Sequence, residues 1–280
     1  MPMRYGLKWS PQSSPLQVEM EFIRGGGFLT VDGKKHGEGL FAHYRALQSL
    51  IWPTTEDHHR WSDLMLSEIL ANRITAISGS RDSGKTHVAL SRFGLTDYFV
   101  FPNETLILIS STDLRGLQLR VWGDIKDLLS KAKELHPWLP GHVVESLHGV
   151  FTDKLGEDTP FRDLRRGIIW IPCLDRRGTW VGGLEKFVGI KQKRRRVLGD
   201  EAQFMTAEYL TILSNLDKGD FKGVVVGNAI ANFKALDKIS EPLERHGNHP
   251  DPVKTEVFPN RYGGRTITLV GTDSPNYDFP

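Results

Sequence analysis

The chain has 280 residues, which is enough for one large domain with a substantial core or for one domain with appendages. Hydrophobic residues make up 39% of it and charged residues 25%, as in ordinary globular proteins, and a net charge of only +2 indicates nothing about nucleic acid. The single cysteine, Cys173, excludes an internal disulfide and a cysteine-rich zinc site. No apolar run approaches the roughly eighteen residues of a membrane span, and the polar first residues lack a signal-peptide core, so neither is predicted.

Residues 1–39 are predicted to form an N-terminal arm and a glycine-rich hairpin region. Residues 1–17 are polar and contain several prolines, a composition that favours a loose arm. Residues 18–23 alternate apolar and acidic side chains, as a half-buried strand does. The glycines that follow lack the spacing of a dinucleotide-binding fingerprint, so we interpret them as turn residues of a hairpin or loop.

A strand, a loop and a helix are predicted next, after two helical patterns at residues 40–52 and 64–70. Residues 74–78 form a short β-branched run that predicts a buried strand. A complete G-x-x-x-x-G-K-[ST] phosphate loop follows, made of Gly79, Ser80, Arg81, Asp82, Ser83, Gly84, Lys85 and Thr86. Apolar residues at helical spacing continue to residue 93, so the motif has the flanking elements that it requires.

The residue types of this loop suit a nucleoside triphosphate. Gly79 and Gly84 allow a tight turn whose N–H groups point inward at a polyphosphate, and the following helix adds its positive dipole end. Lys85 is expected to reach the β- and γ-phosphates of ATP, and the Thr86 hydroxyl to coordinate Mg²⁺. The competing interpretation is a glycine-rich turn with a surface lysine.

Segments just upstream of a phosphate loop often supply an adenine pocket. Gln48, Trp52 and Trp61 are the amide and aromatic groups available for one here. An equally good interpretation is that both tryptophans are core residues of a helical pair.

The rest of the chain alternates predicted strands with predicted helices. Apolar runs predict strands at residues 105–110, 167–173, 223–228 and 266–270, with a shorter one at 197–199, and helical patterns cover 114–132 and 207–216. Residues 141–166 predict no element. This alternation predicts an α/β fold with a mostly parallel sheet flanked by helices. The domain is expected to span residues 40–272, with residues 273–280 as a C-terminal tail.

An acidic pair and an asparagine follow two of these strands. Asp200 would hold the Mg²⁺ shell and Glu201 would polarise the attacking water, the two tasks that an NTPase gives to carboxylates. Asn228 ends the strand at 223–228, where its side chain could bond the γ-phosphate or the attacking water. A simple turn asparagine is the competing interpretation.

Three stretches resemble the large terminase subunits of tailed bacteriophages. They are Gly-Ser-Arg-Asp-Ser-Gly-Lys-Thr at 79–86, Gly-Asp-Glu-Ala-Gln at 199–203 after a basic lead-in, and Val-Val-Gly-Asn at 225–228. The resemblance covers about residues 40–275 and implies a P-loop NTPase of the ASCE, RecA-like type that pumps double-stranded DNA into an empty capsid. It implies ATP and Mg²⁺ as cofactors, and double-stranded DNA, a portal protein, a small terminase subunit and a homo-oligomeric ring as partners.

The same resemblance assigns roles to single residues. Arg81 corresponds to an in-loop arginine that senses phosphate, and Asn228 with the glycine before it corresponds to a coupling motif. The family also uses an arginine that one subunit inserts into the ATP site of its neighbour. We expect it among the basic residues just before Asp200, with Arg194 as first choice and Arg195 or Arg196 as substitutes. Too few carboxylates follow residue 270 for a two-metal nuclease, so the chain is expected to be the motor half without nuclease activity. The expected location is the host cytoplasm.

A basic stretch is the remaining feature of the sequence. Residues 162–196 contain eleven Lys or Arg residues against three acidic ones. Arginine and lysine clusters can contact DNA phosphates without reading bases, which would suit Arg165, Arg166, Arg176, Arg177 and Lys193. Some of these cations could instead reach ATP across a subunit boundary, or form a solvated charged face.

Three functions compete at this point. The leading hypothesis is the ATPase motor of a terminase, in which Glu201 activates water while Arg81 and Asn228 report loss of the γ-phosphate. The alternative is a helicase-like nucleic-acid-dependent ATPase, which should have a second RecA-like lobe. A nucleotide-binding regulatory module without turnover is the third, and a catalytic Glu201 argues against it.

Overall fold

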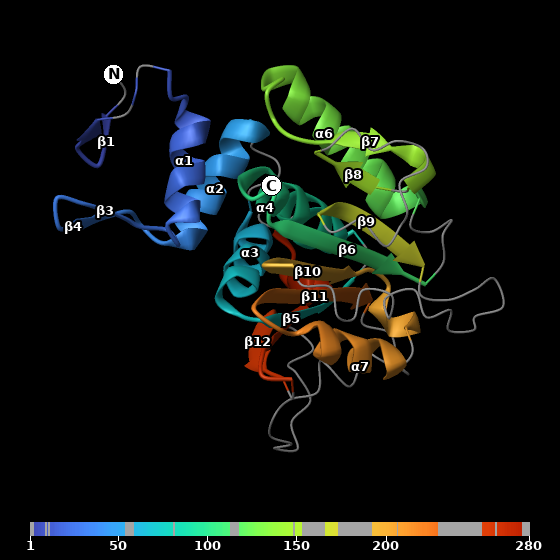
Figure 1. Cartoon of the computed structure of the whole chain (residues 1–280). Coiled ribbons are helices and arrows are strands. Elements are labelled where there is room, and N and C mark those ends of the chain that lie inside the picture. The colour runs from blue at the N-terminus through green and yellow to red at the C-terminus, as the bar shows by residue number, and fades with distance from the viewer. Residues whose placement is uncertain are drawn as a thin grey trace.

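The computed structural model describes residues 3–8, 10, 12–53, 59–80, 82–112, 118–147, 149–152, 166–172, 192–205, 207–228, 254–260 and 262–275. At the centre of this described part lies a nine-stranded sheet in the order β12-β13-β5-β11-β10-β6-β9-β8-β7 (Figure 1). The strands from β13 to β9 in this order are parallel to one another. Their bounds are Ile74–Gly79 (β5), Thr105–Ser111 (β6), Gly167–Pro172 (β9), Arg194–Gly199 (β10), Asp220–Asn228 (β11) and Arg265–Leu269 (β13). The predicted α/β fold with a mostly parallel sheet is confirmed.

Antiparallel strands extend both edges of the parallel block. On one side β12 (Glu256–Pro259) pairs with β13, and on the other β8 (Gly149–Phe151) pairs with β9 and with β7 (His142–Val144). Two of these strands lie in the stretch where the sequence predicted nothing. They are three residues long, which is too short for a period-two pattern to stand out.

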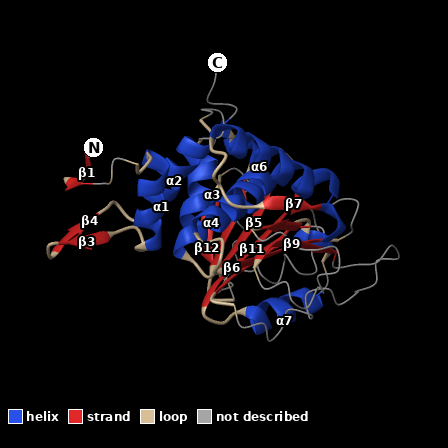
Figure 2. Cartoon of the chain, turned by 45° about the horizontal axis from the view of Figure 1, so that its top comes forward, coloured by secondary structure: helices blue, strands red, loops and turns tan. Residues whose placement is uncertain are grey.

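Helices cover the two faces of the sheet, and the strands bury both of their own faces. All seven residues of β6 are buried, which explains its unbroken apolar sequence. One face carries α3 (Arg60–Ala71), η1 (His87–Arg92), α4 (Phe93–Val100), η2 (Gln118–Trp122) and α6 (Gly123–Leu135), and the other carries α7 (Ala207–Leu216). Figure 2 shows α7 on the side of the sheet opposite α4 and α6. No helix of the described residues is long and apolar enough to cross a bilayer.

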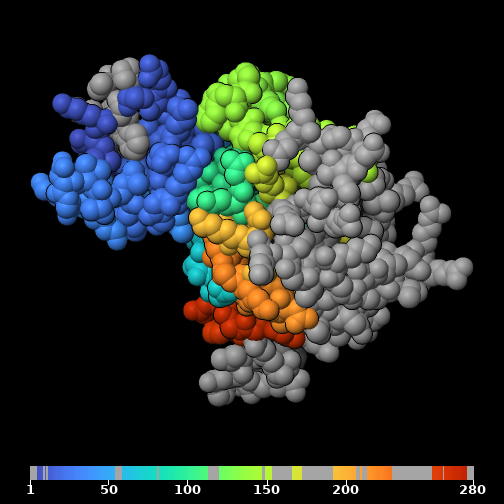
Figure 3. All heavy atoms as spheres, viewed as in Figure 1, coloured from blue at the N-terminus to red at the C-terminus, as the bar shows by residue number. Residues whose placement is uncertain are grey.

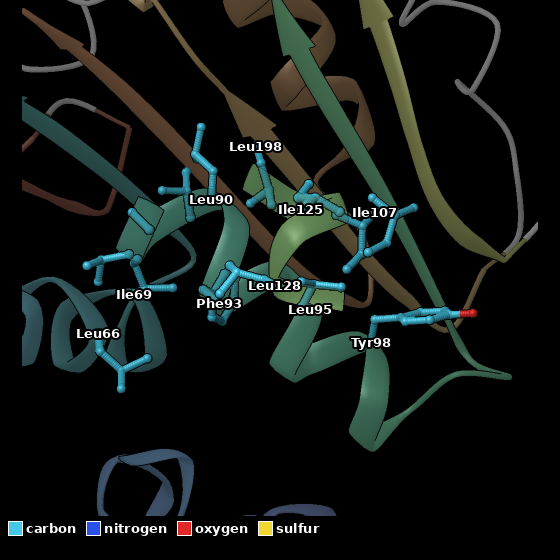
Figure 4. Close-up of a cluster of buried hydrophobic side chains, with 14 of the residues drawn as sticks. Leu66, Ile69, Leu90, Phe93, Leu95, Tyr98, Ile107, Ile125, Leu128 and Leu198 are labelled. Atoms are coloured by element: carbon cyan, nitrogen blue, oxygen red, sulfur yellow. The ribbon is translucent and has the colours of Figure 1, made fainter. Parts of the chain in front are cut away.

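The alternation of side chains along β6 and β10 builds two separate cores. Ile107 and Leu198 point to the face with several helices, where Leu90, Phe93 and Ile125 gather beside them (Figure 4). Neighbouring residues on the same strands point to the other face and pack with α7, among them Leu106, Leu108 and Val197. The central strands are therefore held in register by packing on both sides.

The N-terminal residues form a small unit beside the sheet, coloured blue in Figure 3. It contains α1 (Pro15–Arg24), α2 (Leu40–Ile51) and two hairpins, β1–β2 (Met3–Arg4 and Leu7–Lys8) and β3–β4 (Leu29–Val31 and Lys34–His36). The predicted hairpin in the glycine-rich region is confirmed. The loose arm is wrong for the described part of residues 1–17, because residues 3–8 pair as a hairpin and α1 begins at Pro15.

The strand predicted at residues 18–23 is also wrong, because these residues lie inside α1. Ser14 caps the helix by accepting a hydrogen bond from the Gln17 backbone N–H, the Gln17 side chain accepts one from the Ser14 N–H, and Pro15 occupies the first turn. Leu16, Met20 and Ile23 then pack on the main core, while Val18 and Phe22 face a small core under the hairpins. A helix that is buried on two sides alternates apolar residues locally as a strand does.

Candidate functional site

The phosphate loop leaves the carboxyl end of β5, whose six residues are all buried. Gly79 packs so closely on Leu269 that an added Cβ would lie 2.9 Å from the Leu269 Cβ, and Gly84 has a φ of +72°, which favours glycine. Within the loop, Ser83 Oγ donates to the Ser80 carbonyl oxygen at 3.0 Å. A helix then starts at Lys85 and continues into the π-helical segment η1, so the strand, loop and helix follow in the predicted order.

Lys85 is buried and turned back over the loop. Its Nζ donates to the Ser80 carbonyl oxygen at 2.7 Å. Burial lowers the pKa of Lys85, while Asp200, Glu201 and Asp82 oppose that shift because they favour the charged ammonium. The loop therefore holds a buried ammonium whose charged form is favoured by two carboxylates from another part of the chain.

Asp200 directly follows β10, and its backbone and side chain are both held by hydrogen bonds. Its backbone N–H donates to the Ser110 carbonyl oxygen at 2.8 Å, which fixes the end of β10 against β6. Its Oδ1 accepts a hydrogen bond of 3.0 Å from the Thr86 hydroxyl. The structure thus brings together the two residues predicted as metal ligands, although β10 is not the direct neighbour of β5, because β11 lies between them.

The donor set at Thr86 and Asp200 fits Mg²⁺. Hydroxyl and carboxylate oxygens are hard ligands, and Mg²⁺ commonly takes one or two of them and completes its shell with water and phosphate. Asp200 is buried, and its Oδ2 accepts no hydrogen bond from the described residues. Burial and the neighbouring Glu201 raise the pKa of Asp200, so a nearby divalent cation would relieve both effects. No cluster of three His, Cys, Asp or Glu side chains that could hold a metal occurs in the described residues.

Glu201 follows with an unusual backbone. Its φ of 55° and ψ of 40° lie in the left-handed region, which is uncommon for a residue with a Cβ. Its Oε2 accepts a hydrogen bond from Gln203 Nε2, and its Oε1 lies 3.5 Å from Arg120 Nη1. Asn228 ends β11 and is the Cα partner of Gly79, so it also lies at this edge of the sheet. Its backbone N–H donates to Gln203 Oε1, and its side-chain role stays a prediction.

Arg120 is a site residue that sequence reasoning missed. It lies on η2, half exposed, with its Nε 3.5 Å from Asp200 Oδ2 and its Nη1 at the same distance from Glu201 Oε1. The sequence offers one signal for it, because a helix that follows β6 must start at the carboxyl edge of the sheet. Nothing local distinguishes Arg120 from Arg115, the other arginine of that segment.

The adenine-pocket role of Gln48 and Trp52 stays a prediction, and in this structure their polar atoms are engaged inside the helical core. Both side chains are buried between helices. Trp52 Nε1 donates to the Leu128 carbonyl oxygen at 2.9 Å, and Gln48 Nε2 donates to Thr96 Oγ1 at 3.2 Å. Their polar atoms are therefore used inside the core, and Trp52 and Trp61 are both buried, as the alternative interpretation of the two tryptophans expected.

The role of Arg194 as an arginine acting in trans also stays a prediction, and in this structure its side chain is engaged within its own chain. Arg194 lies at the start of β10, at the other end of the strand from Asp200, and its Nη2 lies 2.8 Å from Asp97 Oδ1. Arg196 Nε pairs with Asp97 Oδ2 at 2.9 Å, and both arginines also pair with Asp220. Arg194 and Arg196 are thus engaged within the fold, and Arg195 donates to the Lys218 carbonyl oxygen. The three arginines therefore have partners within their own chain in this structure.

The proposed DNA contacts are only partly within the described residues. Lys193 is exposed and forms an ion pair of 2.8 Å with Glu104, and Arg166 is exposed just before β9. Arg81, Arg165, Arg176 and Arg177 lie outside the described residues.

Comparisons with known proteins bear on the fold. No protein-family model matches the sequence, and no curated protein matches it. The ATPase domain of the Thermus phage P74-26 large terminase is similar over 80% of this chain and 84% of that chain, with a TM-score of 0.53 and 12% identity. A mutant of that domain aligns over 65% of this chain and 68% of its own, with a TM-score of 0.47 and 14% identity.

A longer relative extends the comparison. The large terminase of a thermophilic bacteriophage aligns over 64% of this chain but 37% of its own length, with a TM-score of 0.42 and 12% identity. The chain therefore spans little more than a third of that protein. The match to the P74-26 domain confirms the expected fold, which is that of a large-terminase ATPase domain.

Proposed function

We propose that this chain is the ATPase motor domain of a viral large terminase subunit, which hydrolyses ATP to move double-stranded DNA into a procapsid. One observation carries the proposal: Asp200 accepts a hydrogen bond of 3.0 Å from Thr86, 114 residues away, at the edge of the sheet where the phosphate loop begins. A glycine-rich turn with a surface lysine would neither bury Lys85 nor bond its neighbour Thr86 to a distant carboxylate. The fold match is consistent with this assignment.

The residues of the site divide the work of hydrolysis. The Lys85 ammonium would leave its hydrogen bond with the Ser80 carbonyl oxygen and bind the phosphate oxygens instead, because these carry a full negative charge. Thr86 and Asp200 would hold Mg²⁺, which supplies charge neutralisation at the β- and γ-phosphates when bound. Glu201 would orient the attacking water and accept its proton. Arg81 would contact the phosphates from within the loop, and Asn228 would sense them from the end of β11.

The proposed partners follow from the motor assignment. Double-stranded DNA is the substrate to be moved, and a portal protein, a small terminase subunit and further copies of the chain in a ring would complete the machine in the host cytoplasm. The proposal includes no nuclease activity for these residues. A helicase-like ATPase would share the same nucleotide site and differ in its response to nucleic acid.

ATP hydrolysis by the chain, with duplex DNA, with single-stranded DNA and with neither, tests the proposal. We expect Mg²⁺-dependent hydrolysis that duplex DNA stimulates more than single-stranded DNA does. Glu201→Gln should lose turnover while a fluorescent ATP analogue still binds. Unchanged hydrolysis in Glu201→Gln would refute its role as the base, and stimulation by single strands alone would favour the helicase-like alternative.

A further inference from the structure

Gln203 is a buried amide inside the site to which the proposed reaction gives no task. It lies on η6 (Ala202–Phe204), two residues after Glu201, and only 4% of it is exposed. Its Nε2 donates to Glu201 Oε2, and its Oε1 accepts a hydrogen bond of 3.1 Å from the Asn228 backbone N–H. Both ends of one carboxamide are therefore used, one on the catalytic carboxylate and one on the sheet.

The carboxylate that Gln203 holds needs such a support. Glu201 has a left-handed backbone, which sterics disfavour for a residue with a Cβ. The 3₁₀ turn that follows restrains its main chain, because the Phe204 N–H donates to the Glu201 carbonyl oxygen at 2.9 Å. That bond does not restrain the side chain, whose charged neighbour Arg120 is half exposed and 3.5 Å away, so a buried partner is needed to fix the direction of the carboxylate.

The other end of Gln203 is anchored next to the phosphate loop. Asn228 is the last residue of β11 and pairs with Gly79, the residue at which the loop leaves β5. A continuous path therefore runs from Gly79 through the Asn228 backbone and the Gln203 carboxamide to Glu201. The pairing of β11 with β5 and two hydrogen bonds hold the residues of this path in place. The path joins the phosphate loop to the carboxylate of Glu201 along the edge of the sheet.

We propose that Gln203 is a positioning residue for Glu201, which sets the distance and direction of its carboxylate relative to the phosphate loop. The inference rests on the proposed ATPase function, because it assigns Glu201 the attacking water. Gln203 binds Oε2, so Oε1, which lies 3.5 Å from the half-exposed Arg120, is the oxygen that would face that water. A movement of Gly79 when phosphate binds would reach Glu201 through this path, so nucleotide binding would align the base.

Two substitutions separate the parts of this role. Gln203→Met keeps the length and flexibility of the side chain and removes both hydrogen bonds. Gln203→Glu keeps an oxygen for the Asn228 N–H but replaces the donor to Glu201 by a second carboxylate oxygen. Both variants should lower kcat by roughly ten- to a hundredfold, while the Kd for the ATP analogue changes by less than about threefold.

Asn260→Leu is the matched control. Asn260 is a fully buried amide whose Oδ1 accepts hydrogen bonds from the Tyr262 and Gly264 backbone N–H groups, at 3.1 and 3.0 Å. It lies before β13, at the opposite end of the parallel strands from the phosphate loop. This variant should lower the melting temperature at least as much as Gln203→Met does, and leave kcat within about twofold.

The readouts are kcat, KM, analogue affinity and thermal melting for all four proteins. Loss of kcat in both Gln203 variants, with affinity kept and the control active, supports the inference. Normal kcat in Gln203→Glu, a parallel loss of kcat and affinity, or failure of both variants to fold would each overturn it. Absence of hydrolysis in the wild type would instead overturn the proposed function.

Discussion

Replacing Asp97 with asparagine should destabilise the fold strongly, because it breaks a buried charge cluster without changing the size of the side chain. Asp97 is 1% exposed and pairs with Arg196 at 2.9 Å and with Arg194 at 2.8 Å. Tyr44 also donates its hydroxyl proton to Asp97 Oδ1, at 2.6 Å. Asparagine cannot offer the negative charge, so the 2% exposed Arg196 would keep only the partly exposed Asp220 as a counter-ion.

The magnitude follows from the burial of the cluster. Removing one partner of a buried ion pair costs about 3–5 kcal/mol, because the remaining charge is left without compensation. In a domain of this size, that loss lowers the melting temperature by roughly 6–20 °C. Urea unfolding followed by circular dichroism measures the free energy of unfolding directly. Asp127→Asn is the control, since Asp127 and its partner Lys131 are exposed and their pair should contribute less than about 0.5 kcal/mol.

The same variant makes a prediction about pH. Burial alone would raise the pKa of Asp97, but Arg196 and Arg194 outweigh burial and hold the pKa below its ordinary value. The folded-state pKa thus lies under the unfolded value of about 3.9, so the stabilisation by Asp97 is fully present above about pH 4. It is lost as the pH falls through the folded-state pKa, and the gap between wild type and variant should narrow there. If Asp97→Asn lowers the free energy of unfolding by less than about 1 kcal/mol at neutral pH, or by no more than Asp127→Asn does, this reasoning is refuted.

Three further outcomes test the site itself. Lys85→Ala should weaken binding of the ATP analogue at least tenfold, because it removes the ammonium that we propose contacts the phosphates; undiminished affinity would contradict the assignment. Thr86→Val keeps the shape of the side chain but removes the hydroxyl 3.0 Å from Asp200, and it should raise the Mg²⁺ concentration needed for half-maximal hydrolysis several-fold. An unchanged Mg²⁺ requirement would exclude Thr86 as a ligand. Trp52→Phe should lower the melting temperature yet keep analogue affinity within about twofold, whereas a large loss of affinity would support the adenine-pocket assignment.

Features that lie in consecutive residues were the ones that could be predicted. β6 is an unbroken apolar run because both of its faces are covered, so its sequence alone predicts a buried parallel strand. The phosphate loop is likewise contiguous, and its flanking strand and helix can be recognised on either side of it. Asp200 could be placed at the same edge because it directly follows a predicted parallel strand.

Features that depend on distant partners could not be predicted in this way. Arg120 approaches Asp200 from a segment 80 residues earlier, and no spacing rule connects the two. Gln203 and Asn228 were visible only as parts of two separate motifs, although a backbone N–H of one bonds the side chain of the other. The helix α1 was mistaken for a strand because its two buried sides face different cores, which only the folded chain reveals.

The three consecutive arginines before Asp200 have partners inside the fold that the local sequence pattern does not reveal. Three consecutive arginines indicate an exposed basic patch, yet alternation along β10 sends Arg194 and Arg196 to the face of Leu198, where Asp97 lies on α4. A one-residue slip of β10 would break the pairs of Arg194 and Arg196 with Asp97, bring Arg195 to that face instead and send Leu198 to the α7 face. These ion pairs and the alternation of Val197 and Leu198 between the two cores therefore fix the register of β10 together. Because Asp200 directly follows the last residue of β10, they also fix the carboxylate that meets Thr86 at its other end.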